Sequence, residues 1–267
     1  MDTSKPDAVV LREVVLRERG ASSFLPARLL PQLADTAELV AVAKALPSLV
    51  VSVLVPKVKG AERAIQVGAD AMLLPLSASH AHSLASLRET PVEMVAALSR
   101  IVALRIASGS ACRVEVGLST AFGCTIQGEV SHAESSRLVQ AVLDAGVGSM
   151  GLADTMGDAG PLQVNVLAAW QQGICRFGAW LAGIGGCPHA PGASGNGATE
   201  DVVCLFVGMG VPSADGCDAR LALRTQAAGW LAGDALHGSI WRAGLPRTLR
   251  DGVGAGVGDG VGAGVRT

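Results

Sequence analysis

Hydrophobic residues along this chain occur in short runs, and helical patterns separate them. Ala8 to Leu16 is rich in β-branched residues, and Leu49 to Val55 is apolar at all but one position. The second run is typical of a parallel strand that is buried on both faces. Further strands are expected at residues 71–74, 112–118, 149–152 and 177–181, about six strands in all.

The intervening segments have helical periodicity. Helices are expected at residues 28–45, 61–67, 91–108, 133–145, 162–172, 200–209 and 218–231, whereas residues 77–83, Ser-Ala-Ser-His-Ala-His-Ser, are expected to form a loop. A strand followed by a helix recurs about every 30 residues, which predicts parallel pairing and right-handed crossovers. Roughly 250 residues of such units predict an α/β fold of the TIM (β/α)8 type. With about six strands, that barrel is expected to be incomplete.

Composition narrows the class of protein. Hydrophobic residues make up 49% of the chain and charged residues 16%. The net charge is -2 and the basic residues form no stripe along the sequence, so nucleic acid is not an expected partner. The longest apolar run is too short to cross a membrane, and the first residues do not resemble a signal peptide. The six cysteines form no Cys-x-x-Cys pair. Reduced thiols and a cytoplasmic location are therefore expected.

The C-terminal residues differ from the rest of the chain. Asp251 to Gly258 is repeated almost letter for letter as Asp259 to Arg266, with four glycines in the first octad and three in the second. Such a segment has high backbone entropy and little to bury. We therefore expect a barrel domain over residues 1–247 and a disordered tail over residues 248–267.

One glycine-rich stretch, Gly183 to Asn196, places Cys187 among small residues. Glycine allows tight turns and close approach to a ligand, and an exposed thiol in a polar loop is a candidate for chemistry. The simpler interpretation is a long connection between a strand and the helix that Thr199 and Glu200 open. Neither interpretation is excluded by the spacing alone.

Six segments together form a recognisable pattern: Leu11–Glu18, Ser23–Gln32, Val53–Gly60, Thr120–Gly128, Leu152–Gly157 and Gly185–Asn196. This pattern resembles the hydroxymethylglutaryl-CoA lyase family of metal-dependent barrel lyases. The resemblance runs from about Val9 to Arg247, and the glycine-rich loop is its most specific part.

This resemblance implies a carbon–carbon lyase that cleaves an acyl-CoA, hydroxymethylglutaryl-CoA, to acetyl-CoA and acetoacetate with Mg²⁺ or Mn²⁺. The metal would act as Lewis acid and template, an arginine would stabilise the enolate, and the loop cysteine would transfer a proton. A homodimer is common in the family.

By motif, the resemblance assigns Cys187, Arg17 and Asp154 as catalytic residues and Glu18 and Asn196 as metal ligands. Glu18 stands where the family has an aspartate. Without the family, Arg17 and Glu18 would be interpreted as a solvated charge cluster. Asp154 would be interpreted as a helix cap or Asx-turn.

The sequence departs from the family in two places, Arg19–Gly20 and Gly160–Asn165. At each place, about one strand and one helix of the family are missing. The second gap should hold a His-x-His pair of metal ligands. His80 and His82 have the same spacing, but they are expected to lie in an ordinary loop. The alternative hypothesis is an inactive remnant that serves only as a structural or subunit-interaction protein. A phosphate-binding module has no support beyond glycine richness, because neither GxGxxG nor GxxxxGK[ST] is present.

Overall fold

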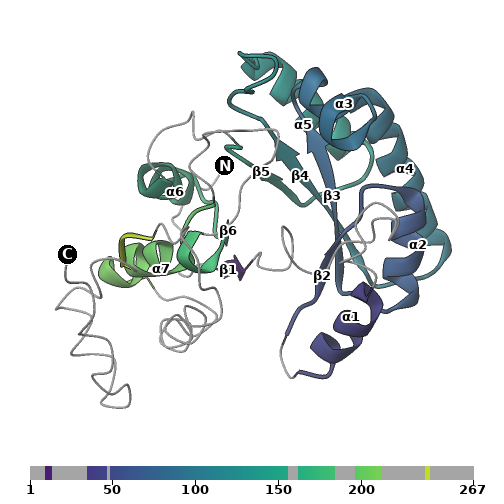
Figure 1. Cartoon of the computed structure of the whole chain (residues 1–267), viewed down its shortest axis with the longest axis horizontal. Coiled ribbons are helices and arrows are strands. Elements are labelled where there is room, and N and C mark those ends of the chain that lie inside the picture. Colours follow the sequence, from purple (N-terminus) through teal and green to yellow (C-terminus); the bar gives the residue numbers. More distant parts are fainter. Residues whose placement is uncertain are drawn as a thin grey trace, which may run out of the picture. The chain divides into compact units, whose positions relative to one another are not determined.

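The computed structural model describes residues 10–13, 35–46, 49–155, 162–183, 196–211 and 238–240 (Figure 1). The chain divides into two compact units. The first consists of Met1–Val14, Pro161–Ile184 and Asn196–Thr267, and the second of Val15–Gly160 and Gly185–Gly195. The predicted tail at residues 248–267 and the predicted helix at residues 218–231 lie outside the described residues.

The second unit is built on a four-stranded parallel sheet of β2 (Ser52–Leu54), β3 (Ala71–Ser77), β4 (Arg113–Ser119) and β5 (Met150–Leu152). Spatial order follows chain order, as expected for consecutive βα units. The longest pairing joins β3 to β4 from Ala71–Arg113 to Ser77–Ser119. Parallel strands all point one way, so the segments after β3, β4 and β5 emerge at the same edge.

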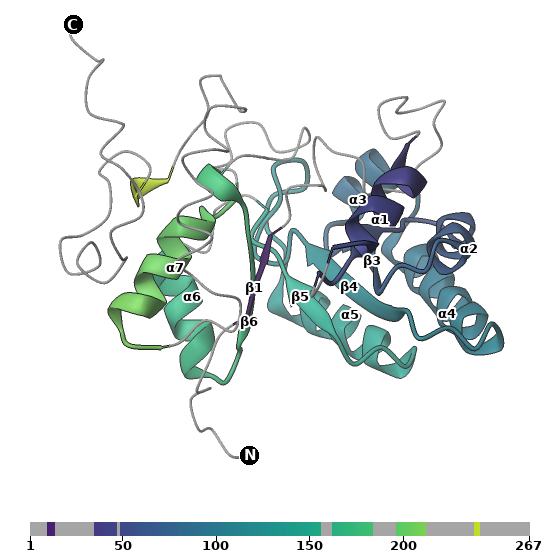
Figure 2. The same cartoon turned by 90° about the horizontal axis from the view of Figure 1, so that it is seen from below.

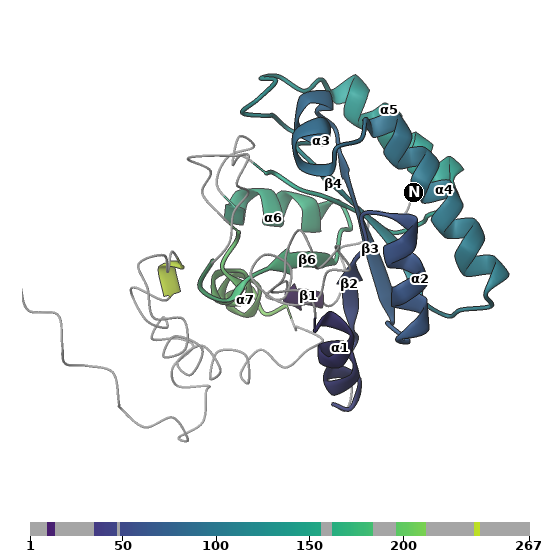
Figure 3. The ribbon, with the colours of Figure 1, turned by 45° about the vertical axis from the view of Figure 1, so that its right-hand side comes forward.

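Helices cover one face of this sheet, as Figure 3 shows for α2 and α4. They are α1 (Thr36–Lys44), α2 (Val58–Gln66), α3 (His80–Leu87), α4 (Pro91–Ala107) and α5 (His132–Asp144). Alternate residues of the sheet face them: Met72, Leu74 and Leu76 of β3 are each 1% exposed and join the helices in one apolar core. This burial supplies most of the unit's stability.

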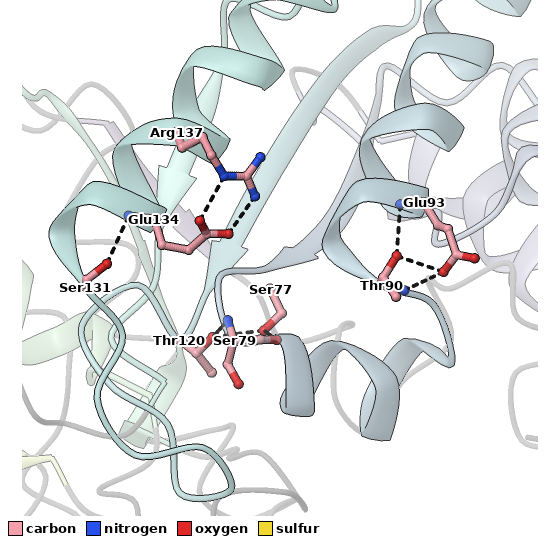
Figure 4. Close-up of polar contacts among 8 residues, drawn as sticks. All are labelled: Ser77, Ser79, Thr90, Glu93, Thr120, Ser131, Glu134 and Arg137. Atoms are coloured by element: carbon pink, nitrogen blue, oxygen red, sulfur yellow. Dashed lines mark hydrogen bonds and ion pairs between the residues drawn. The ribbon is translucent and has the colours of Figure 1, made fainter.

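Local signals set where the two long helices begin. Thr90 accepts a hydrogen bond from the Glu93 amide, and the Glu93 carboxylate accepts one from the Thr90 amide, which completes a capping box for α4 (Figure 4). Ser131 accepts from the Glu134 amide in the same way at the start of α5.

The first unit pairs β1 (Val10–Glu13) with β6 (Arg176–Ala179) in parallel, beside α6 (Leu162–Gln171) and α7 (Thr199–Gly208) (Figure 2). Phe206 of α7 is fully buried, 6.0 Å from the ring of Trp170 and 5.5 Å from that of Phe177. These aromatic rings and the surrounding valines form a separate core.

The six predicted strands correspond to the six that the described residues contain, and the parallel pairing is confirmed. The predicted loop at residues 77–83 is wrong. Ser77 completes β3, and α3 begins at His80 because the Ser79 hydroxyl accepts from the His82 amide and caps the helix. None of the described helices is long and apolar enough to cross a membrane.

Candidate active site

Buried hydroxyl groups gather where β3 and β4 end. Ser77, Ser79 and Thr120 are 0% exposed. Figure 4 shows their side chains close together at the carboxyl edge of the sheet. The Oγ atom of Ser77 lies 2.9 Å from Oγ1 of Thr120, which also accepts from the Ser79 amide at 3.0 Å. In open parallel sheets and barrels, this edge is where ligands bind.

The loop after β4 is held against the same group. Cys124 and Gly128 exchange two backbone hydrogen bonds of 2.9 and 2.7 Å, so the loop turns back on itself. The side-chain oxygen of Gln127 then accepts from the Ser79 hydroxyl at 3.1 Å and from the Ala81 amide at 3.3 Å. This loop belongs to the segment Thr120–Gly128 that carries part of the family resemblance.

The segment after β5 brings Asp154 to this edge. The Ala153 amide donates to Leu118 of β4 at 2.9 Å, and the Thr155 hydroxyl accepts from the Thr120 amide at 2.8 Å. Asp154 lies between these two anchored residues and is partly exposed. A partly exposed carboxylate at the carboxyl edge suits acid–base chemistry on a bound substrate.

His80 and His82 do not form a metal-binding pair. They lie on helix α3, where residues two apart point to different sides. His82 is 5% exposed, and its Nδ1 lies 3.0 Å from the Ser77 hydroxyl, whereas His80 is exposed. Within the part of the chain that the structure describes, no group of three or more His, Cys, Asp and Glu side chains could hold a metal ion.

In the first unit, the described residues on either side of the glycine-rich loop are tied together. Trp180 donates its amide to Gly197 at 2.8 Å and accepts from the Thr199 amide at 2.9 Å. Both oxygens of Glu200, which is 2% exposed, lie 3.0 Å from the Ala182 amide. Ala182 has the left-handed backbone angle φ = 58°, so this contact holds a strained turn.

The adjacent carboxylate binds another segment. Asp201 accepts from the amides of Ser239 and Ile240, each at 2.8 Å. A Cβ on Gly238 would lie 2.8 Å from a Glu200 carboxylate oxygen and 3.1 Å from Cβ of Ala198, so a larger residue would have to displace this carboxylate. The first turn of α7 therefore anchors two separate pieces of chain by their backbone amides.

The site residues assigned from the sequence divide into two groups. Asp154 and Asn196 are described, Asp154 in the second unit and Asn196 in the first. Cys187, Arg17 and Glu18 lie outside the described residues. The sequence interpretation missed the buried group around Ser77 and Thr120 and the Glu200 anchor. The one sequence signal for the buried hydroxyl group was Ser79 as a possible helix cap. The one signal for the anchor was the position of Glu200 directly after Thr199, where a helix was expected to begin.

Cys112 offers no alternative nucleophile. It is 4% exposed, and burial, with the nearby Asp70 carboxylate, raises the pKa of its thiol to about 11. Roughly one such thiol in a thousand is ionised at pH 8.

We expect iodoacetamide to label native Cys112 at least ~100-fold more slowly than denatured Cys112 at pH 8. The labelling rate of native Cys112 should rise as the pH approaches 11. Peptide mapping by mass spectrometry measures both rates, and equal rates would contradict the burial.

Comparison with known proteins finds homologues among acyl-CoA lyases. No family profile matches the chain. It is 36% identical over 208 residues to (R)-citramalyl-CoA lyase of Chloroflexus aurantiacus, covering 67% of this chain and 64% of that protein. It is 31% identical over 220 residues to mitochondrial hydroxymethylglutaryl-CoA lyase of Arabidopsis thaliana, covering 72% and 47%. The chain thus spans less than two thirds of either relative, which is consistent with the missing segments.

Solved structures extend the likeness to the fold. The chain matches an HMG-CoA lyase of Acinetobacter baumannii, solved with coenzyme A and 3-methylmalate, with a TM-score of 0.80 and 28% identity over 90% of this chain and 96% of that one. It matches the HMG-CoA lyase of Bacillus subtilis with a TM-score of 0.79 and 22% identity, over 89% and 98%. The second match supports the fold alone, and together they confirm the expected α/β-barrel class. These findings identify the chain as a homologue of the hydroxymethylglutaryl-CoA lyase family.

Proposed function

We propose that the chain is a carbon–carbon lyase that cleaves hydroxymethylglutaryl-CoA to acetyl-CoA and acetoacetate. One observation carries the proposal: 90% of the chain matches an HMG-CoA lyase structure at 28% identity with a TM-score of 0.80. The Gly185–Asn196 loop, the part of the sequence most specific to the family, supports it. So does the position of Asp154 at the carboxyl edge of the sheet.

The reaction has a simple electron balance. A base removes the proton of the β-hydroxyl, the bond between the α- and β-carbons breaks, and its electron pair becomes the enolate of acetyl-CoA. The β-carbon becomes the ketone of acetoacetate, and an acid then returns a proton to the α-carbon. We assign acid–base roles to Asp154 and Cys187. Arg17 stabilises the enolate charge.

A divalent cation, Mg²⁺ or Mn²⁺, belongs to the proposal through the family resemblance, with Glu18 and Asn196 as ligands. Asn196 is the one of the two that the structure describes. The described residues alone do not make a metal site.

A second substrate is favoured by a specific observation. The sequence identity to (R)-citramalyl-CoA lyase is 36%, which is higher than the 31% identity to the plant HMG-CoA lyase. The two substrates in these names, citramalyl-CoA and hydroxymethylglutaryl-CoA, are thioesters with a methyl group and a hydroxyl on the β-carbon. They differ in the length of the carboxylate arm. Cleavage of citramalyl-CoA by the same steps would release pyruvate in place of acetoacetate.

Purified protein, assayed with each thioester and with Mg²⁺, Mn²⁺ or EDTA, tests the proposal. We expect acetyl-CoA with acetoacetate from the first substrate or with pyruvate from the second, and loss of either activity in EDTA. The metal should also raise the melting temperature. No ketoacid from either substrate, together with no effect of metal on melting, would favour the inactive remnant. The domain over residues 1–247, the homodimer and the cytoplasmic location stay predictions.

A further inference from the structure

We propose that Thr120 and Thr155 are positioning residues that form a clasp holding Asp154 at the carboxyl edge of the sheet. The clasp is the hydrogen bond of 2.8 Å from the Thr120 amide to the Thr155 hydroxyl. It joins the end of β4 to the residue that directly follows Asp154. The consequence for catalysis rests on the proposed function, but the clasp itself does not.

Thr120 is fixed by buried partners. Its hydroxyl lies 2.7 Å from the Ser119 carbonyl, 2.9 Å from the Ser77 hydroxyl and 3.0 Å from the Ser79 amide. If Thr120 donates to Ser119, then Ser77 donates to Thr120, and Nδ1 of His82 donates to Ser77 across 3.0 Å. The same Ser77 hydroxyl also donates to the Ser79 carbonyl at 3.1 Å, so its single proton is shared between two acceptors. These hydrogen bonds link the buried group into one unit in a setting that excludes water.

The backbone of Thr120 points to a role beyond packing. Its φ angle is 53°, in the left-handed region that a β-branched residue rarely adopts. Such strain persists only where surrounding contacts enforce it, and it is concentrated at functional sites. Here the left-handed turn directs the Thr120 amide to Thr155 instead of continuing the ladder of β4.

The clasp extends a short strand pairing beside Asp154. β5 has three residues and, among the described strands, pairs with β4 alone. Leu152, its last residue, is 57% exposed. Beyond it, and among the described residues, the Ala153 amide donates to Leu118 at 2.9 Å and the Ala121 amide makes a long contact of 3.5 Å with the Ala153 carbonyl. The clasp therefore fixes the backbone on the C-terminal side of Asp154, where the pairing of β5 with β4 has ended.

The test compares Thr155→Val, which keeps the shape and removes the acceptor, with Thr155→Ser, which keeps the acceptor. Ser83→Ala is the matched control. Ser83 is 0% exposed and its hydroxyl donates to the Glu89 carbonyl at 2.6 Å, outside the clasp. Amide hydrogen exchange of peptides covering residues 118–124 and 150–155 is followed in each variant, together with kcat and KM for the cleaved thioester.

We expect exchange in both peptides to be at least ~10-fold faster in Thr155→Val, and unchanged in Thr155→Ser and Ser83→Ala. The kcat of Thr155→Val should fall by about 10²-fold with KM nearly unchanged, as for a misplaced catalytic group, and Thr155→Ser should restore it. Wild-type exchange rates in Thr155→Val would overturn the clasp, even in a protein without lyase activity. Faster exchange with unaltered kcat in an active enzyme would overturn its role in positioning Asp154. Absence of wild-type turnover would count against the proposed function, and the exchange rates would still decide the clasp.

Discussion

Replacing Cys187 with serine is expected to lower kcat for thioester cleavage by about 10²–10⁴-fold, the range typical of lost acid–base catalysis. A thiol with a pKa near 8.5 can deliver a proton to an enolate at neutral pH and be reprotonated quickly, whereas a serine hydroxyl is far too weak an acid. The substitution changes one atom, so substrate binding should be nearly unaffected. Steady-state kinetics of acetyl-CoA formation measures kcat and KM separately.

Cys204→Ser is the matched control for this substitution. Cys204 lies on α7, is partly buried, and has the pKa of its thiol raised by burial and by the nearby Asp201 carboxylate. The Cys204→Ser substitution should leave kcat within about twofold of wild type, because substitutions of partly buried residues away from the site have small effects on activity. Full activity in Cys187→Ser would remove the loop cysteine from the mechanism.

The second large effect is expected at Glu200. Replacing it with alanine removes both acceptors of the Ala182 amide, leaves that buried N–H unsatisfied and opens a cavity. We expect a loss of about 3 kcal/mol in the free energy of unfolding, which lowers the melting temperature by roughly 6–12 °C for a chain of this size. Cleavage should weaken too, because the glycine-rich loop starts directly after this turn.

Glu200→Gln separates the hydrogen bond from the charge. The amide oxygen can still accept from Ala182, so this variant should lose less than half as much stability as Glu200→Ala. Thermal melting followed by circular dichroism compares the two variants with wild type. A Glu200→Ala protein that melts at the wild-type temperature would show that the anchor contributes nothing.

Much of the fold could be predicted from the sequence because its signals are local. The apolar run Leu49–Val55 and the alternating residues of β3 follow directly from burial of a sheet against helices. The start of α4 follows from the Thr90–Glu93 capping box with Pro91 beside it. Such signals need no knowledge of distant parts of the chain.

The site was less predictable because its contacts join residues far apart in the sequence. Ser77 and Thr120 are 43 residues apart, and Thr120 and Thr155 are 35 apart. Residues 77–83 look like a loop because serine and histidine are poor helix formers, yet the Ser79 cap begins α3 there. Asp154 was assigned a catalytic role only through a family motif, and this role stays a prediction, since an isolated Asp-Thr pair equally suits a turn.

The central claim is that this chain breaks the bond between the α- and β-carbons of a thioester. The most direct measurement is mass spectrometry of the products formed from hydroxymethylglutaryl-CoA or citramalyl-CoA in D₂O buffer with Mg²⁺. The proposed reaction protonates the enolate from the protein, so it predicts acetyl-CoA with deuterium in its methyl group and one equivalent of ketoacid. Free coenzyme A with the intact hydroxy acid, or unchanged thioester, would contradict it.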